Sequence, residues 1–229
     1  MRKMFLYSNN AESFEGHMKP FIEFSGGEKA VIAFCCEGAA GWEPYFEDFR
    51  ELCLYLGAAE VFAVAPVKGT TRLDETATSN IEKATGIFIT GGNTLNYWSI
   101  YCSPEIKELI RKKYFEGIPY AGLSAGSMIA ADKVYCAEEG LNEVSAGIEL
   151  VKDLLVVPHF SEWNMFPTLI NDIEIVKPLF AAGIDENACL EITNETSVKV
   201  LGEKCFLFKR TENNDYNLKV LRNGDVFDV

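Results

Sequence analysis

Ser124 is the side chain in this sequence whose surroundings best fit a nucleophile. It lies within Gly-Leu-Ser-Ala-Gly at residues 122–126, directly after the apolar run 118–123. A G-x-S-x-G pattern between a strand and a helix is typical of a nucleophile elbow, a sharp turn that lifts the hydroxyl off the strand end. Backbone N–H groups that begin the next helix are unpaired and can hold an oxyanion. The pattern predicts acyl chemistry at Ser124, with a purely structural glycine turn as the alternative.

A serine hydroxyl needs a neighbouring base before it attacks a carbonyl. The chain has two histidines, His17 and His159. His17 lies in an irregular segment after the first predicted strand, whereas His159 directly follows the apolar run 154–157. Function gathers at the carboxyl ends of parallel strands, and we expect strand 154–157 to share a sheet with strand 118–123, which puts His159 at the same sheet edge as Ser124. We therefore expect His159 to be the base.

The base in turn needs a carboxylate that fixes its tautomer and stabilises the imidazolium. Six acidic residues lie between the serine and the histidine: Asp132, Glu138, Glu139, Glu143, Glu149 and Asp153. Residue type and spacing do not choose among them, and at least five are expected to be solvated surface charges.

A second glycine turn, at residues 91–94, follows the apolar run 86–90. It is another strand end of the kind that borders the crevice of an α/β sheet. We expect this turn to face the same crevice as Ser124, with a plain tight turn as the alternative.

The elements that would position these residues alternate between strand and helix. Apolar runs typical of strands buried in a parallel sheet lie at residues 29–36, 61–65, 86–90 and 118–123. Helical patterns lie between them at residues 43–56, 94–98 and 105–115, and residues 81–84 end a short polar helix. This order predicts an α/β protein with a mostly parallel sheet and helices on both faces.

The second half of the chain is less regular. Residues 132–150 look irregular, and residues 163–180 read as a helix. Alternating residues predict antiparallel strands at 187–192, 197–201, 204–208 and 216–221. We expect one domain over residues 1–229, with an antiparallel C-terminal edge.

Composition limits the function classes. A net charge of −13 over 229 residues argues against nucleic acid or an anionic membrane as the main partner. No apolar run is long enough to span a bilayer, and the start has too short an apolar core for a signal peptide. The seven cysteines lack metal-like spacing and are expected to be reduced and mostly buried in a cytoplasmic protein. We expect no metal site and no cofactor.

Three motifs together resemble one known family. Residues 90–94, residues 122–126 and Pro158-His159-Phe160 occur in the order and at the spacing of the S51 serine peptidases, which include aspartyl dipeptidase (dipeptidase E) and cyanophycinase. The segment Gly-Ile-Asp-Glu at residues 183–186 also resembles the cyanophycinase-like branch. The resemblance implies a three-layer α/β/α fold, similar to class I glutamine amidotransferases and flavodoxin.

The same resemblance implies a catalytic triad. Ser124 would be the nucleophile and His159 the base. The acid of the family lies about fifteen residues after the serine, which corresponds to Glu139, with Glu138 as the fallback. No metal takes part in this chemistry.

The resemblance also implies contacts around the triad. Gly92 and Ala125 would donate backbone N–H groups to the oxyanion. Independently of the resemblance, we expect Asn93 and Trp163 to contact substrate. Aspartyl substrates call for an arginine near the histidine, but residues 161–165 read Ser-Glu-Trp-Asn-Met. This departure weakens the expectation of carboxylate-directed specificity. Trp163 and Met165 suggest a more apolar or differently tuned pocket, with a core role for either side chain as the favoured alternative.

These expectations combine in a serine hydrolase that cleaves small peptides, aspartyl peptides among them, through an acyl-enzyme on Ser124. Its partner would be a small peptide or amide, and a homodimer is left open. One alternative is a catalytically inactive glutamine-amidotransferase-like protein that binds or senses a ligand. Another is an ester or lactam hydrolase, because one scaffold carries many chemistries.

Overall fold

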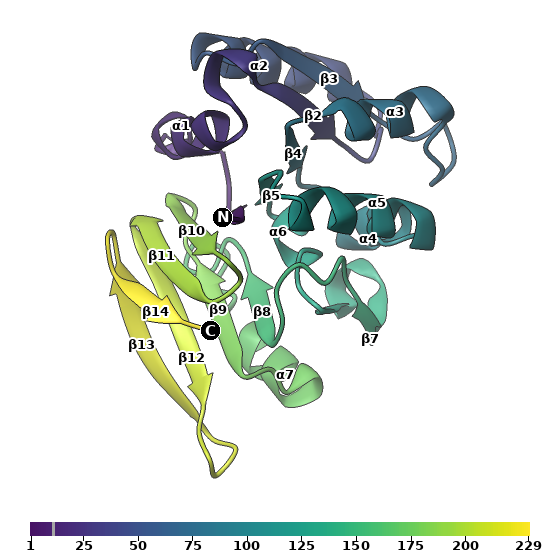
Figure 1. Cartoon of the computed structure of the whole chain (residues 1–229). Helices are drawn as coiled ribbons and strands as arrows, with labels where there is room; N and C mark the ends of the chain where they lie inside the picture. Colours follow the sequence, from purple (N-terminus) through teal and green to yellow (C-terminus); the bar gives the residue numbers. More distant parts are fainter. Residues whose placement is uncertain (11) are drawn as a thin grey trace.

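A mixed sheet of eight strands forms the centre of the molecule. The computed structural model describes residues 1–10 and 12–229 (Figure 1). The strands lie in the order β14 (Val226–Asp228), β11 (Ser197–Gly202), β10 (Ala188–Thr193), β1 (Lys3–Tyr7), β5 (Tyr120–Leu123), β4 (Gly86–Ile89), β2 (Val31–Cys35) and β3 (Glu60–Val64). The strands from β1 to β3 in this order are parallel, and β10, β11 and β14 add an antiparallel side.

Helices cover both faces of the parallel strands (Figure 1). Successive strand residues point to opposite faces, so Phe34 packs with one set of helices and Ala33 with the other. The first set is α1 (Phe14–Phe24) and α2 (Trp42–Tyr55), and the second is α3 (Glu75–Lys83), α4 (Thr94–Tyr101) and α5 (Pro104–Phe115). The three layers expected from the sequence are confirmed.

A second sheet packs beside the first. Its strands lie in the order β13 (Tyr216–Arg222), β12 (Lys204–Arg210), β9 (Phe180–Ile184) and β8 (Leu154–Val157). Helix α7 (Phe166–Val176) covers one face, and the other face shares a core with the antiparallel strands of the large sheet. The prediction that strand 154–157 shares a sheet with strand 118–123 is wrong, because β8 pairs with β9 instead.

Two segments that looked irregular in the sequence form regular elements. Residues 14–24 form α1 around Pro20, because the buried side chains of this segment recur at helical spacing. Residues 133–146 form a hairpin in which the short 3-10 turn η2 (Ala137–Glu139) joins β6 (Lys133–Cys136) to β7 (Leu141–Ala146). The turn of this hairpin forms one wall of the candidate site.

Within residues 1–10 and 12–229, no helix is long and apolar enough to cross a bilayer. Over the same residues, no three His, Cys, Asp or Glu side chains lie close enough together to hold a metal ion. The seven cysteines are free, and five of them are buried.

Candidate active site

Ser124 occupies a strained turn between β5 and α6 (Ala125–Met128). Its backbone has φ 49° and ψ −111°, an uncommon conformation for a residue with a side chain. The turn depends on Gly126, where an added Cβ would lie 2.2 Å from the carbonyl oxygen of Ile89. The Ser124 N–H donates to the Tyr7 carbonyl at 2.9 Å, which ties the turn to β1. This is the geometry of the predicted elbow.

His159 lies within reach of the serine. Its Nε2 is 3.1 Å from Ser124 Oγ, a hydrogen-bonding distance suited to proton transfer. The imidazole is buried, and the backbone N–H of His159 donates to Ser8 Oγ at 2.7 Å. His17, the other histidine, contacts Ser13 near the start of α1 instead. The juxtaposition of Ser124 and His159 therefore matches the expectation from their two strand ends.

Glu186 supplies the carboxylate beside the histidine. Its Oε1 is 3.0 Å from His159 Nδ1, and the carboxylate is about three-quarters buried. A carboxylate there holds a proton on Nδ1 and leaves Nε2 free to accept the serine proton. The neighbouring Asp185 is buried and accepts the Ser161 N–H at 3.1 Å, which anchors the loop that follows His159.

The structure differs here from the sequence expectation, which assigned the acid to Glu139 or Glu138. The Glu139 carboxylate accepts the backbone N–H of Thr94 at the start of α4. The Glu138 carboxylate accepts the Thr168 hydroxyl at 3.1 Å. Both acids belong to η2, which faces the start of α4 and α7 and not the Nδ1 side of His159.

The Gly91-Gly92 turn lies against the nucleophile. A Cβ added to Gly91 would be 2.9 Å from Ser124 Cβ, so only glycine allows this approach. Gly92 has φ +156°, and a Cβ there would be 2.4 Å from Glu37 Oε1. Ala125 begins α6, where a backbone N–H has no partner within the helix. The two expected oxyanion donors thus belong to segments that meet at Ser124.

The two expected substrate contacts are placed differently. Trp163 is 62% exposed and stacks on His159, with ring centroids 4.0 Å apart and an interplanar angle of 9°. It lines the pocket, so the alternative of a core role for it is wrong. The Asn93 side chain accepts the Asn96 N–H at 3.1 Å and so caps α4.

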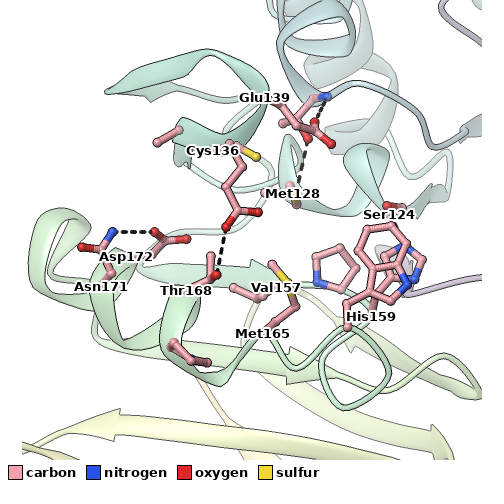
Figure 2. Close-up of a pocket in the computed structure, with 16 residues that line it drawn as sticks. Ser124, Met128, Cys136, Glu139, Val157, His159, Met165, Thr168, Asn171 and Asp172 are labelled. Atoms are coloured by element: carbon pink, nitrogen blue, oxygen red, sulfur yellow. Dashed lines mark hydrogen bonds between the residues drawn. The ribbon is translucent and has the colours of Figure 1, made fainter.

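A cavity of about 340 Å³ opens beside Ser124 and His159 (Figure 2). The η2 turn forms one wall and α7 another, with Met128, Val157 and Met165 between them. Its polar lining includes three acids, Glu138, Glu139 and Asp172, and no lysine or arginine among the described residues. Burial, with Glu138 nearby, raises the pKa of Asp172 to about 6. The pocket is therefore apolar in its middle and acidic in charge.

Comparison with known proteins gives the family. The model of peptidase family S51 matches residues 4–200. The chain belongs to peptidase family S51. Its S51 relatives include a cyanophycinase from Trichormus variabilis, 23% identical over 201 residues, and a peptidase E from Nostoc sp., 26% identical over 227 residues. The alignment with the cyanophycinase covers 81% of this chain and 65% of that protein. The alignment with the peptidase E covers 91% of this chain and 89% of that protein.

The fold matches two solved structures of peptidases. A peptidase from an acI-B1 actinobacterium superposes with a TM-score of 0.77 at 20% identity, covering 100% of this chain and 97% of that one. A putative peptidase E from Listeria monocytogenes superposes with a TM-score of 0.63 at 20% identity, covering 88% and 98%. The resemblance noted from the motifs and the expected α/β/α fold are both confirmed. The chain spans about two-thirds or less of the length of several cyanophycinases that it matches.

Proposed function

We propose that this S51 member is a serine peptidase that cleaves small peptides through an acyl-enzyme on Ser124. The observation that carries the proposal is the continuous relay from Ser124 Oγ to His159 Nε2, at 3.1 Å, and from His159 Nδ1 to Glu186, at 3.0 Å. The names of the relatives, cyanophycinase and peptidase E, support a peptide as the substrate.

In this mechanism His159 takes the proton of Ser124 as the serine oxygen attacks the carbonyl carbon. Glu186 stabilises the imidazolium that forms, and His159 then gives the proton to the leaving amine. Water repeats the sequence against the acyl-enzyme, with His159 again as the base. The carboxylate that we assign to this role is Glu186 and not Glu139.

The oxyanion would be held by backbone N–H groups of Gly92 and Ala125. The close approach of Gly91 to Ser124 supports the first, and the position of Ala125 at the start of α6 supports the second. Such donors stabilise charge that develops in the transition state, which is where they accelerate the reaction.

The size and charge of the pocket limit the substrate. A volume of about 340 Å³ is at the lower end for ligand pockets and suits a dipeptide or one side chain of a longer peptide. An aspartyl group would bring a further negative charge to a lining that already holds three acids. We therefore favour small peptides without an acidic residue at this position.

Labelling with a fluorophosphonate probe tests the proposal. We expect the wild type to label, Ser124→Ala to lose the label, and His159→Gln to label at least about 100-fold more slowly. Ser161→Ala is the matched control, because it removes an exposed hydroxyl from the loop after His159 and should label normally.

Two results would contradict the peptidase assignment. One is labelling that persists in Ser124→Ala. The other is a folded wild type that neither labels nor hydrolyses any member of a dipeptide panel, which would favour the binding-protein alternative.

A further inference from the structure

The peptide bond between Gly91 and Gly92 decides where the Gly92 N–H points. In a planar trans peptide the C=O and the N–H point in opposite directions. The direction of the Gly91 carbonyl therefore fixes the direction of the Gly92 N–H. Glycine adopts positive and negative φ about equally readily, so a peptide between two glycines can turn over at little local cost. Another part of the molecule must hold it.

Tyr97 of α4 contacts both residues of this peptide. Its hydroxyl donates to the Gly91 carbonyl at 2.9 Å, and its side chain is 1% exposed. Its ring lies against Gly92, where an added Cβ would be 2.9 Å from Tyr97 Cε2. Within residues 1–10 and 12–229, Tyr97 is the only donor to the Gly91 carbonyl. One buried side chain thus holds the peptide in its present orientation.

Thr90 holds the hydroxyl of Tyr97 in turn. The two hydroxyl groups are hydrogen-bonded, and Thr90 is also buried. A phenol has one proton, which Tyr97 gives to the Gly91 carbonyl, so Thr90 donates in this contact. Burial raises the pKa of Tyr97, which keeps the phenol protonated throughout the neutral range. The Thr90 carbonyl accepts the Gly126 N–H at 3.1 Å, which connects this chain of contacts to the elbow.

We infer that Tyr97 is a positioning residue that directs the Gly92 N–H toward the oxyanion, with Thr90 holding its hydroxyl. The inference rests on the proposed function, in which Gly92 and Ala125 are the oxyanion donors. Among the described residues, neither of these N–H groups donates to a backbone carbonyl. Without the phenol, the Gly91 carbonyl would face the edge of a buried ring with no donor, which is unfavourable. The peptide is then expected to turn over and take the Gly92 N–H away from the site.

The rate of fluorophosphonate labelling tests this role without a known substrate. The phosphoryl oxygen of the probe occupies the place of the oxyanion when Ser124 attacks phosphorus. We expect Tyr97→Phe to label at least tenfold more slowly than the wild type at every pH from about 5 to about 9, because an oxyanion donor is lost. The midpoint of the pH dependence reports the titration of His159 and should stay the same. A displaced imidazole would instead move that midpoint.

Tyr101→Phe is the matched control. Tyr101 lies one turn further along α4 and is also buried, and its hydroxyl donates to the Cys36 carbonyl at 2.7 Å. The variant removes the same group from the same helix but leaves the Gly91 carbonyl its donor. We expect it to label within about threefold of the wild type.

Thr90→Val tests the contact that holds the phenol, and it keeps the Tyr97 ring in place if Tyr97→Phe does not fold. We expect it to lower the labelling rate at least threefold. The double variant Tyr97→Phe/Thr90→Val should label at the same rate as Tyr97→Phe alone, because residues that act through one contact are not additive. A further loss in the double variant would show that Thr90 does not act through Tyr97.

Crystal structures of the wild type and Tyr97→Phe measure the orientation of the Gly91–Gly92 peptide directly. We expect the peptide to be turned over in the variant, in all or part of the molecules. This readout does not require activity.

The outcomes separate this role from the peptidase assignment. If the wild type does not label but the peptide turns over in Tyr97→Phe, the positioning role stands and the peptidase assignment fails. If the wild type labels and Tyr97→Phe labels within threefold of it, the positioning role is overturned and the peptidase assignment stands. An unchanged peptide orientation in Tyr97→Phe, or an equal loss of labelling in Tyr101→Phe, also overturns the positioning role.

Discussion

Ser124, His159 and Glu186 follow the ends of three strands, β5, β8 and β9, that belong to two sheets. Each side chain is held by a backbone feature of its own. Ser124 and His159 both have positive φ. Asp185, the buried neighbour of Glu186 in the chain, accepts the Ser161 N–H and so ties this segment to the loop after His159. The three side chains of the relay thus lie on short turns, and the ends of β5, β8 and β9 position those turns.

Replacing Glu186 by glutamine should lower kcat by about 100- to 10,000-fold, because an amide can favour the wrong histidine tautomer. Glu139→Gln is the matched comparison. Its amide oxygen can still accept the Thr94 N–H, so we expect a loss of less than tenfold. Steady-state kinetics on one peptide measures kcat for both variants. A larger loss of kcat in Glu139→Gln than in Glu186→Gln would mean that Glu139, the acid expected from the sequence, is the partner of His159.

Asp172 should destabilise the folded protein at neutral pH. Its pKa is raised from 3.8 to about 6, so between these values the folded state binds more protons than the unfolded state. Stability at this site therefore falls as pH rises from about 4 to about 6. Asp172→Asn should raise the free energy of unfolding by about 1 to 3 kcal/mol at pH 8, and much less at pH 3.

Urea unfolding at the two pH values measures this difference. Glu174→Gln, on the exposed side of the same helix, should show little change at either pH. An equal effect of Asp172→Asn at pH 3 and pH 8 would mean that ionisation of this carboxyl does not cause the stabilisation.

At the residue scale the sequence was informative where a motif marked a strand end. Ser124 and His159 were predicted in this way, and their predicted proximity is found. The Glu186 contact was missed because only acids between the two were considered. The strand before it, β9 (Phe180–Ile184), was not predicted either, because the predicted helix ended at residue 180 and the predicted antiparallel strands began at 187. The available signal was the Gly-Ile-Asp-Glu segment at residues 183–186.

At the scale of elements, the elbow depends on close packing between β4, β5 and α6. Gly126→Ala should place a methyl group on the Ile89 carbonyl and cost about 3 kcal/mol or more of unfolding free energy. Gly16→Ala in α1 is the matched control, because an added Cβ there meets no atom within 4 Å. It should leave stability unchanged or raise it by up to about 1 kcal/mol. Thermal and urea unfolding measure both variants. An equal change in stability for Gly126→Ala and Gly16→Ala would contradict this account.

The parallel strands were predicted from sequence to within a few residues, because long apolar runs are a strong signal. The hairpin of β6 and β7 was not, since both strands are short and the pairing shifts register between Val134 and Cys136. This omission mattered for the site. The turn of that hairpin holds Glu138 and Glu139, and its position decides which partners they have.

At the scale of the whole molecule, the relay requires the two sheets to keep a fixed position relative to each other, because Ser124 follows a strand of one sheet and His159 a strand of the other. Ser8, at the end of β1, accepts the backbone N–H of His159 that follows β8. The sequence did not reveal this relation, because it depends on β8 leaving the large sheet to pair with β9. The contact therefore joins a strand end in one sheet to the base in the other.

Ser8→Ala should weaken both stability and catalysis. The buried N–H of His159 would lose its acceptor, at a cost of about 1 to 3 kcal/mol, and we expect kcat to fall more than tenfold as the imidazole shifts. Ser161→Ala, an exposed hydroxyl, is the control. Unfolding and kinetics together test the contact, and full activity in Ser8→Ala would show that it does not position His159.

The indole of Trp163 lies face to face with the imidazole of His159 and is mostly open to solvent. Its emission should therefore respond to the charge of that ring and to any molecule that settles against it. Comparison with Trp163→Phe separates its signal from those of the other two tryptophans, Trp42 and Trp98. Trp163 therefore provides an intrinsic fluorescent probe of the site, and no synthetic dye is needed.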